Sequence, residues 1–153
     1  MKKNNITPDT LVKEHPELFK YAYPLIGAGW LSILDTLCSV IKHHIKWEVE
    51  KGMTIVPDGK QPPEEGEWMP QFFFSQLKEK FGTGRFYYYG GDDYIKGAVE
   101  FAEAITAHTC EECGNRGEKK PTSWIKTLCD ECFESYEQIR QERWSKWENE
   151  REQ

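Results

Sequence analysis

The chain has 153 residues, 38% of them hydrophobic and 14% aromatic, and a formal net charge of −6. This length allows one domain of ordinary size and a smaller module. The negative charge disfavours general nucleic-acid binding, because binding along a phosphate backbone needs a basic footprint. No apolar run approaches the length of a membrane span, so we expect no membrane partner.

The first third of the chain predicts helices. Thr7-Pro8-Asp9 favours a helix start, with proline at the first helical position. From Trp30 to Val49 the apolar residues recur at the spacing of an amphipathic helix, and Gly52 can end it. Cys38 falls within this pattern, and we expect a buried thiol that packs as a small apolar side chain.

Residues 52–70 differ in composition, since they hold four prolines, three glycines and four acidic residues. This composition predicts a long exposed loop. Because such a segment cannot bury a core, we expect the fold to tolerate its shortening, including deletion of residues 58–66.

Residues 72–81 and 85–89 predict two strands joined by a turn at Gly82-Thr83-Gly84. Strict alternation would place two sets of side chains on opposite faces. One set is Phe72, Phe74, Gln76, Lys78 and Lys80; the other is Phe73, Ser75, Leu77, Glu79 and Phe81. A hairpin alone is marginal in water, so we expect either the two long helices to cover it or another chain to extend it.

A further helix is expected after the hairpin. Gly90-Gly91 breaks the second strand, and Asp92 or Asp93 can cap the helix that follows. Its buried stripe would be Ile95, Ala98, Val99, Ala102 and Ile105.

Two C-x-x-C pairs follow, separated by fifteen residues, which is typical of a four-thiolate zinc site. Four sulfurs fill the tetrahedral coordination of zinc and leave no position for a reactive water. We expect one structural Zn²⁺ bound by Cys110, Cys113, Cys129 and Cys132. The alternatives are two disulfides or idle thiols. We see no signal peptide, which argues against disulfides and favours a cytoplasmic location.

The segment around the second pair predicts the rest of the finger. Residues 124–128 favour a short strand, and no Gly or Pro follows Asp130. Cys129 and Cys132 would therefore lie at the start of a final helix, as in a treble-clef finger. Rings recur along that helix at steps of three and four residues. We expect it to pack on another subunit, making a homo-oligomer, on a partner, or back onto the hairpin.

The predicted fold class is α+β, with amphipathic helices packed on a β-hairpin and a C-terminal treble-clef-like zinc finger with a terminal helix. We expect two domains. Residues 1–108 would form the α+β core with its exposed loop, and residues 109–153 the zinc finger and C-terminal helix.

Cations and rings gather on the predicted hairpin, and such a surface can hold a phosphate and stack a base. The candidate ligand-binding residues are Gln76, Lys78, Lys80, Arg85, Tyr87 and Tyr89. In the alternative, the rings are core residues and the lysines are charges that protect an edge strand. The residues alone favour this alternative.

We find no catalytic motif. His43 and His44 diverge by about 100° on a helix and cannot chelate one ion together. A nucleophile elbow, a P-loop and an H-E-x-x-H motif are all missing from the sequence. We therefore identify no catalytic residue and expect a protein that is not an enzyme.

Three groups of residues resemble one known family. They are Gly29-Trp30 with Leu37-Cys38; residues 76–82 with Arg85-Phe-Tyr87; and residues 109–114 with residues 124–130. From about residue 15 to 132 the chain is similar to small uncharacterised proteins encoded by bacteriophages and some bacteria. It departs from them at Leu31, where an aromatic residue is usual, at Gly84, where leucine is usual, and at Cys132, where many have histidine. The resemblance implies phage origin and an accessory function, and no reaction.

Two functions remain open from the sequence. The first is a phage accessory protein, acting in counter-defence in the host bacterial cytoplasm, that binds a nucleotide-like small molecule or a host protein. The second is a zinc-finger module that binds nucleic acid or regulates transcription. The net charge of −6 favours the first.

Overall fold

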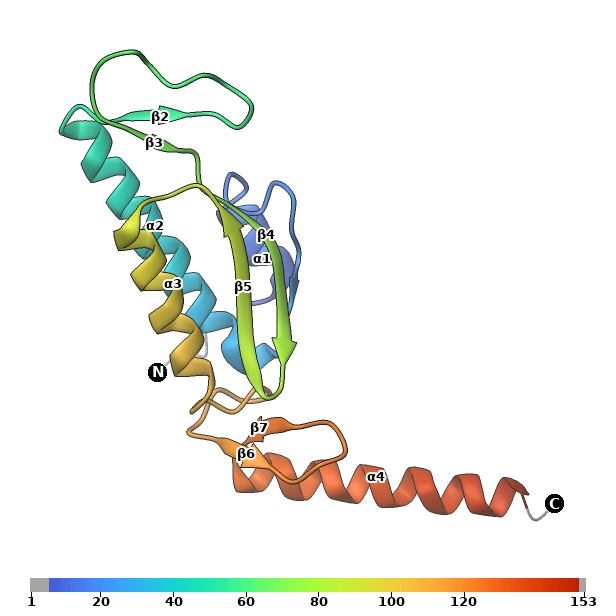
Figure 1. Cartoon of the computed structure of the whole chain (residues 1–153). Helices are drawn as coiled ribbons and strands as arrows, with labels where there is room; N and C mark the ends of the chain where they lie inside the picture. Colours follow the sequence, from blue (N-terminus) through green and yellow to red (C-terminus); the bar gives the residue numbers. More distant parts are fainter. Residues whose placement is uncertain (1–5, 152–153) are drawn as a thin grey trace.

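The computed structural model describes residues 6–151 and has a mixed α+β fold, as predicted (Figure 1). Its helices are α1 (Pro8–Glu14), the 3-10 turn η1 (Ala28–Trp30), α2 (Leu31–Glu50), α3 (Asp93–Thr106) and α4 (Asp130–Arg151). Its strands are β1 (Pro24–Leu25), β2 (Thr54–Val56), β3 (Trp68–Pro70), β4 (Phe73–Lys80), β5 (Thr83–Tyr89), β6 (Glu118–Lys120) and β7 (Lys126–Leu128).

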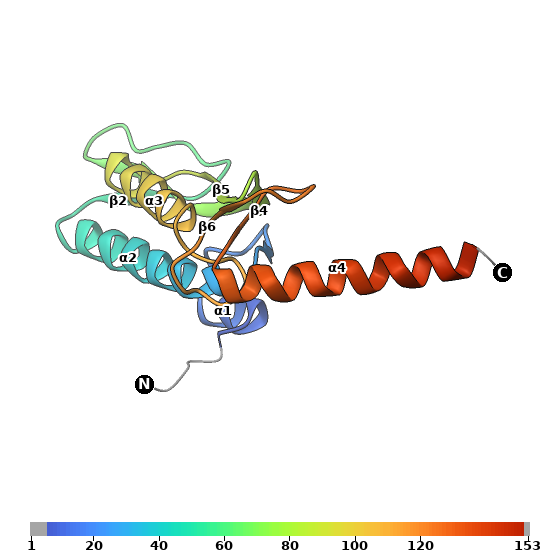
Figure 2. The ribbon, with the colours of Figure 1, turned by 90° about the horizontal axis from the view of Figure 1, so that it is seen from below.

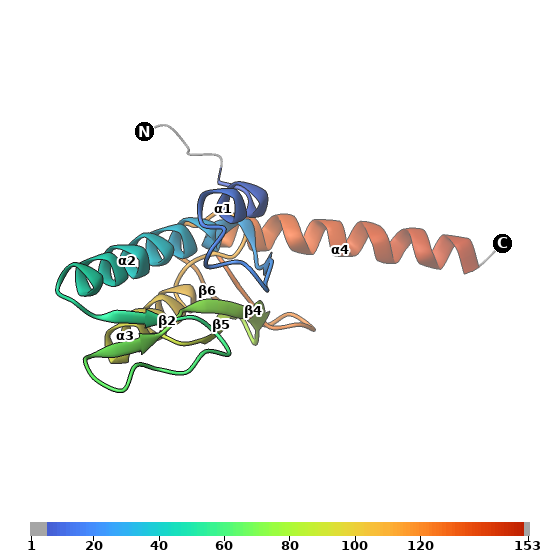
Figure 3. The ribbon, with the colours of Figure 1, turned by 90° about the horizontal axis from the view of Figure 1, so that it is seen from above.

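The core lies between the β4–β5 hairpin and the helices. Strand β4 pairs with β5 antiparallel and with β1 parallel, which makes a three-stranded sheet in the order β1-β4-β5. Helices α2 and α3 lie side by side and contribute buried residues to the same cluster as the hairpin (Figure 1, Figure 3). The expectation that helices cover the hairpin is therefore confirmed. Cys38 of α2 is fully buried in this core, as predicted.

The hairpin turn differs from the predicted one. Lys80 pairs with Thr83, so the turn consists of Phe81 and Gly82, and both have positive φ, at 54° and 74°. Two residues with positive φ match the right-handed twist of an antiparallel pair, which explains why this turn replaces the three-residue one. Gly84 lies instead in β5, where a Cβ atom would be 3.1 Å from Cγ2 of Thr106 in α3.

Strict alternation fails within β4. The register shifts between Phe74 and Gln76, which leaves Ser75 as an extra residue in this strand. As a result Phe74 and Leu77, three positions apart, are both fully buried. The predicted division of the strand into two faces is therefore wrong before the bulge.

Helix α3 protects the free edge of the sheet. The backbone N–H of Gly84 donates to Oγ1 of Thr106 at 2.8 Å, and that of Phe86 donates to Oε1 of Glu103 at 2.6 Å. Unpaired N–H groups on an edge strand can pair with another chain. The two side chains of α3 satisfy them instead. The cap of α3 is Asp92, whose carboxylate accepts from the N–H of Ile95, as expected.

The segment 52–70 is only partly the exposed loop that its composition predicts. Its ends form the parallel pair β2–β3, and Val56 and Met69 are buried. Residues 57–67 between the strands are exposed, as expected. The many prolines and glycines predict a loop, so composition gives no sign of the two short strands. Each strand forms only by pairing with the other, at the opposite end of the segment.

Helix α4 projects from the rest of the molecule as an arm (Figure 2). It is 22 residues long, and no residue between 130 and 151 is buried. Among the helices of residues 6–151, none has the length and apolar character needed to cross a membrane.

Candidate metal centre and ligand-binding face

The first cysteine pair is docked on the core through η1. The backbone N–H of Gly29 donates to the carbonyl of Glu111 at 2.8 Å, and Nε1 of Trp30 donates to the carbonyl of Thr109 at 2.7 Å. A Cβ atom at Gly29 would lie 2.1 Å from the carbonyl oxygen of Cys110. Only glycine allows the two backbones to approach this closely.

The second cysteine pair is positioned by β7 and α4. Strands β6 and β7 form a short antiparallel hairpin, and β7 leads directly into the pair. Cys129 immediately precedes α4 and Cys132 lies in its first turn, with the N–H of Phe133 donating to the carbonyl of Cys129 at 2.9 Å. The predicted helix start is confirmed, and the predicted strand over residues 124–128 is present but shorter, because Trp124 and Ile125 lie outside β7.

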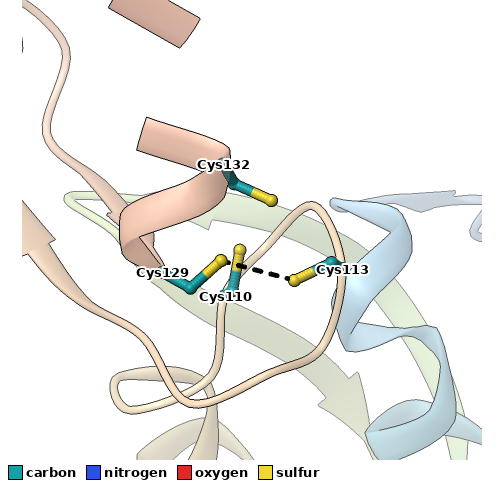
Figure 4. A group of neighbouring side chains, drawn as sticks. All are labelled: Cys110, Cys113, Cys129 and Cys132. Carbon is teal, nitrogen blue, oxygen red and sulfur yellow. Dashed lines mark hydrogen bonds between the residues drawn. The ribbon is translucent and has the colours of Figure 1, made fainter. Parts of the chain in front are cut away.

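The four sulfur atoms converge (Figure 4). The Sγ atoms of Cys110, Cys113, Cys129 and Cys132 all lie within 4.8 Å of one another, and those of Cys113 and Cys129 are 3.6 Å apart. Four thiolates at the usual zinc–sulfur length of about 2.3 Å would be roughly 3.8 Å apart in a tetrahedron. The donor set can therefore hold a metal ion after small side-chain adjustments. All five cysteines of the chain are free, so the disulfide alternative is not what the structure shows.

The surroundings of the cluster favour deprotonation of one cysteine but oppose deprotonation of all four. Burial alone would raise the pKa of Cys110, but three backbone N–H groups of the two pairs donate to its sulfur and lower the pKa to about 7. Burial, followed by the neighbouring sulfurs, raises the pKa of Cys132. A cation at the centre removes this opposition, because a bound metal stabilises the thiolates that coordinate it.

Lysines beside the cluster are paired with acids of the same segment. Lys126 forms an ion pair with the buried Glu111 and lies 3.6 Å from Glu112. Lys120 contacts Asp130 at 2.6 Å and Glu118 at 2.8 Å. Residues 114–129 hold four bases and one acid, so these ion pairs neutralise part of a local excess of positive charge.

The six candidate ligand-binding residues lie on the outward side of the β4–β5 hairpin. Cross-strand pairing sets Gln76 opposite Tyr87 and Lys78 opposite Arg85. Nζ of Lys78 lies over the ring of Tyr87, 5.2 Å from its centre. The structure therefore brings these four together in two adjacent pairs.

The other two candidates are further along the same face. Lys80 is at the tip, opposite Thr83, and Tyr89 is at the far end, opposite Phe73. Tyr87 is 44% exposed and Tyr89 64% exposed. The interpretation of the rings as core is therefore wrong for these two tyrosines, although it holds for Phe86, which is buried.

Two contacts between the finger and the hairpin were not foreseen. Oγ1 of Thr127 donates to the carbonyl of Gly82 at 2.6 Å, and Nε1 of Trp124 donates to Oε2 of Glu79 at 2.6 Å. They hold the hairpin tip against β7. The sequence marks residues 124–128 as a strand, but residue spacing carries no signal for a partner 45 positions away.

A second convergence of ligand-type side chains lies between α1 and α2. Glu14, His15 and Asp35 can bring one donor atom each within 4.8 Å of the others. Nε2 of His15 is 3.1 Å from Oδ1 of Asp35. A hydrogen bond that ties the end of α1 to α2 accounts for this pair.

Comparisons with known proteins give no family for this chain. No protein-family model matches it, and no match was found among the curated proteins or the solved structures. The site is therefore interpreted from its own geometry alone.

Proposed function

We propose that this chain is a non-enzymatic binding protein braced by one structural zinc ion, and that the outward face of its hairpin holds an anionic, nucleotide-like ligand. The convergence of four cysteine sulfurs carries the first half of this proposal. The half-buried Lys78 and Arg85, together with the exposed rings of Tyr87 and Tyr89 on the same sheet face, carry the second.

Zinc is the metal that best suits the cluster. Four thiolates in a tetrahedral arrangement favour zinc or iron–sulfur centres, and sites closed by four protein ligands are structural. A cysteine pair docked on the core, a short hairpin and a second pair at a helix start support a treble-clef-like finger. The ion would join η1, β7 and α4, and it leaves no coordination position for substrate.

The first prediction concerns metal content. Protein purified without chelator should carry one zinc per chain, measured by mass spectrometry of the metal. Cys113→Ser should lower this content because it removes one of four ligands. Cys38→Ala is the matched control, since Cys38 lies in the core away from the cluster. Zinc well below one per wild-type chain would contradict the structural site.

The ligand half of the proposal rests on chemistry that recognises nucleotides. Lysine and arginine offer charge-assisted hydrogen bonds to phosphate, and tyrosine rings offer a surface on which a base can stack. Lys78, Arg85 and Tyr87 present both kinds of group on adjacent cross-strand pairs. A host protein with an acidic patch is the alternative occupant of the same face.

The second prediction tests this face by isothermal titration with a panel of ribonucleoside triphosphates and cyclic dinucleotides. Wild type should bind at least one of these probes, and Lys78→Ala with Arg85→Ala should weaken that binding. Each lost contact costs about 1.5–3 kcal/mol, or roughly tenfold or more in Kd. The control is Lys46→Ala with Lys96→Ala, two exposed lysines of α2 and α3. Equal affinity in the folded hairpin variant would contradict the assignment.

The phage origin and the counter-defence role remain proposals. They rest on the resemblance of three residue groups alone. Binding of a cyclic dinucleotide in the titration above would support a counter-defence role. The nucleic-acid alternative would be favoured if wild type bound labelled oligonucleotides with a steep dependence on salt.

A further inference from the structure

Three aromatic rings from three neighbouring chain segments meet at one end of the outward hairpin face. Phe73 of β4 is paired with Tyr89 of β5, and their ring centres are 5.6 Å apart. Phe73 also meets the ring of Tyr21, edge to face, with the centres 4.9 Å apart. We define Tyr21, Phe73 and Tyr89 as the three-ring cluster.

Tyr21 reaches this cluster through the segment that leads into β1. Strand β4 is the middle strand of its sheet, so this segment runs beside β4 on the side away from β5 (Figure 1). The N–H of Phe74 donates to the carbonyl of Leu18 at 2.8 Å, which holds the segment against β4. Residue spacing gives no sign of this contact, because Tyr21 and Phe73 lie far apart in the sequence.

The cluster has a buried centre and two exposed outer rings. Phe73 is only 7% exposed, whereas Tyr21 is 55% exposed and Tyr89 is 64% exposed. Aromatic side chains on a protein surface can stack nucleic-acid bases, because every base has a π-face. Two exposed rings packed against one buried ring offer a wider surface for a flat ligand than a single tyrosine does.

The nearest cations of the hairpin lie one step towards its tip. Tyr87 and Tyr89 are two residues apart on β5, which separates their rows by about 7 Å. Nζ of Lys78 lies over the Tyr87 ring, and Arg85 is the cross-strand partner of Lys78. Arg85 also lies 4.0 Å from Glu103, so we expect Lys78 to make the stronger contact with an anion.

We propose that the ligand is a purine nucleotide that lies along the hairpin, with its base on the three-ring cluster and its phosphate on Lys78 and Arg85. This inference rests on the proposed function and adds an orientation and a base class to it. A cation one row from the rings suits a nucleotide, because one sugar joins its base to its 5′-phosphate. Two exposed rings favour a purine over a pyrimidine, because the larger base covers more of both.

The proposal changes the set of residues expected to bind the ligand. Tyr21 joins the set, and Lys80 leaves it, since Nζ of Lys80 lies over the ring of Phe81 at the hairpin tip. Lys20 is the competing cation, because its Nζ lies 4.9 Å from the centre of the Tyr21 ring. A ligand turned end for end would place its phosphate there. Two cations attract a phosphate more strongly than one, which favours the orientation towards Lys78.

The test is isothermal titration of the full chain with ATP, GTP, UTP and CTP. Wild type should bind ATP or GTP more tightly than either pyrimidine nucleotide. Tyr21→Leu removes the ring but keeps an apolar cover over Phe73, and it should weaken purine binding by about five- to a hundredfold. Tyr21→Phe keeps the ring and should bind like wild type. The matched control is Tyr94→Leu, because Tyr94 of α3 is a tyrosine of similar exposure, 57%, outside this face.

Fluorescence of 2-aminopurine riboside triphosphate separates stacking from phosphate contact, because stacking on a ring quenches this base. Lys78→Ala should need more protein to bind the probe but quench it fully at saturation. Tyr21→Leu should quench it less even at saturation. Lys20→Ala should match wild type in both respects. Circular dichroism and thermal unfolding check that each variant is folded.

The outcomes distinguish this inference from the proposed function on which it rests. A wild-type protein that binds none of these nucleotides overturns both. If wild type binds them and folded Tyr21→Leu does so equally well, with equal quenching, the ligand site survives but the three-ring cluster is not its base subsite. Equal affinity for purines and pyrimidines overturns the base class. Loss of binding in Lys20→Ala but not in Lys78→Ala overturns the orientation.

Discussion

Gly29 lies where the backbone of the core touches the backbone of the first cysteine pair. Its N–H donates to the carbonyl of Glu111, and the neighbouring Trp30 donates to Thr109 from a fully buried ring. The conformation of Gly29 is available to other residues, so the requirement for glycine is one of space. One residue without a side chain thus sets how closely the first cysteine pair docks on the core.

The third prediction concerns this contact. Gly29→Ala would place Cβ 2.1 Å from the carbonyl oxygen of Cys110 and 2.4 Å from the N atom of Gly114. Both are backbone atoms of the turn that carries the first cysteine pair, so the turn must move. We expect a loss on the order of 1–3 kcal/mol in the free energy of unfolding, measured by urea denaturation of the zinc-loaded protein.

Gly97→Ala in α3 is the control for this substitution. Nothing lies within 4 Å of a Cβ atom at Gly97, and alanine favours a helix over glycine by about 0.5–1 kcal/mol. The free energy of unfolding should therefore fall in Gly29→Ala and rise in Gly97→Ala. If both changed stability alike, close approach at Gly29 would not be the reason for glycine.

At the scale of elements, the β2–β3 pair changes what can be removed from the chain. The two strands are parallel, with Thr54 opposite Trp68 and Val56 opposite Pro70. The chain must therefore return along the length of the pair before β3 begins, and residues 57–67 make this return. Parallel strands need a crossover of about a dozen residues or more, whereas antiparallel strands can be joined by two.

The fourth prediction tests whether the length or the composition of the segment that joins β2 to β3 matters for stability. Deleting residues 58–66 should disrupt the pair and expose Val56 and Met69, contrary to what composition alone indicates. Burial of each side chain contributes about 1.5–3 kcal/mol, so the urea midpoint should fall. Replacing residues 61–66 by glycine and serine at constant length should leave the midpoint nearly unchanged. Equal stability of both variants would show that the crossover is not needed.

At the scale of the whole molecule, the four-cysteine cluster brings together parts that make few other contacts. The finger touches the core at η1 and at the hairpin tip, through Trp30, Thr127 and Trp124. Helix α4 begins at the second cysteine pair and then leaves the body of the protein (Figure 2). The start of this helix is therefore anchored through Cys129 and Cys132 and through Asp130, which pairs with Lys120 at 2.6 Å.

The fifth prediction follows from this arrangement. Chelation should melt α4 and the β6–β7 hairpin while the helices of the core remain, because metal binding at such sites is coupled to folding. Since α4 has 22 residues, about a third of those in α-helices, ellipticity at the helix band should fall by up to that share. Added zinc should restore it. Unchanged ellipticity in protein shown to be metal-free would contradict the role of the ion.

The sequence by itself determined the features whose causes are local. These features are the cap at Thr7, the apolar period of α2, an aspartate cap of α3 at Asp92 or Asp93, and the two C-x-x-C pairs. Each depends on residues a few positions apart. The periodicity of apolar residues and the spacing of cysteines in the sequence indicate such local contacts directly. For this reason the cysteine cluster and the helix that follows it could be predicted from residue spacing alone.

Only the tertiary structure decided the features that depend on distant partners. The extra residue at Ser75 redirects the side chains of β4, and the pairing of β2 with β3 makes strands from a segment rich in proline. The outward position of Tyr87 and Tyr89, and the backbone contact at Gly29, also come from packing. These positions follow from which faces must be buried against other elements, and that choice is made between segments far apart in the chain.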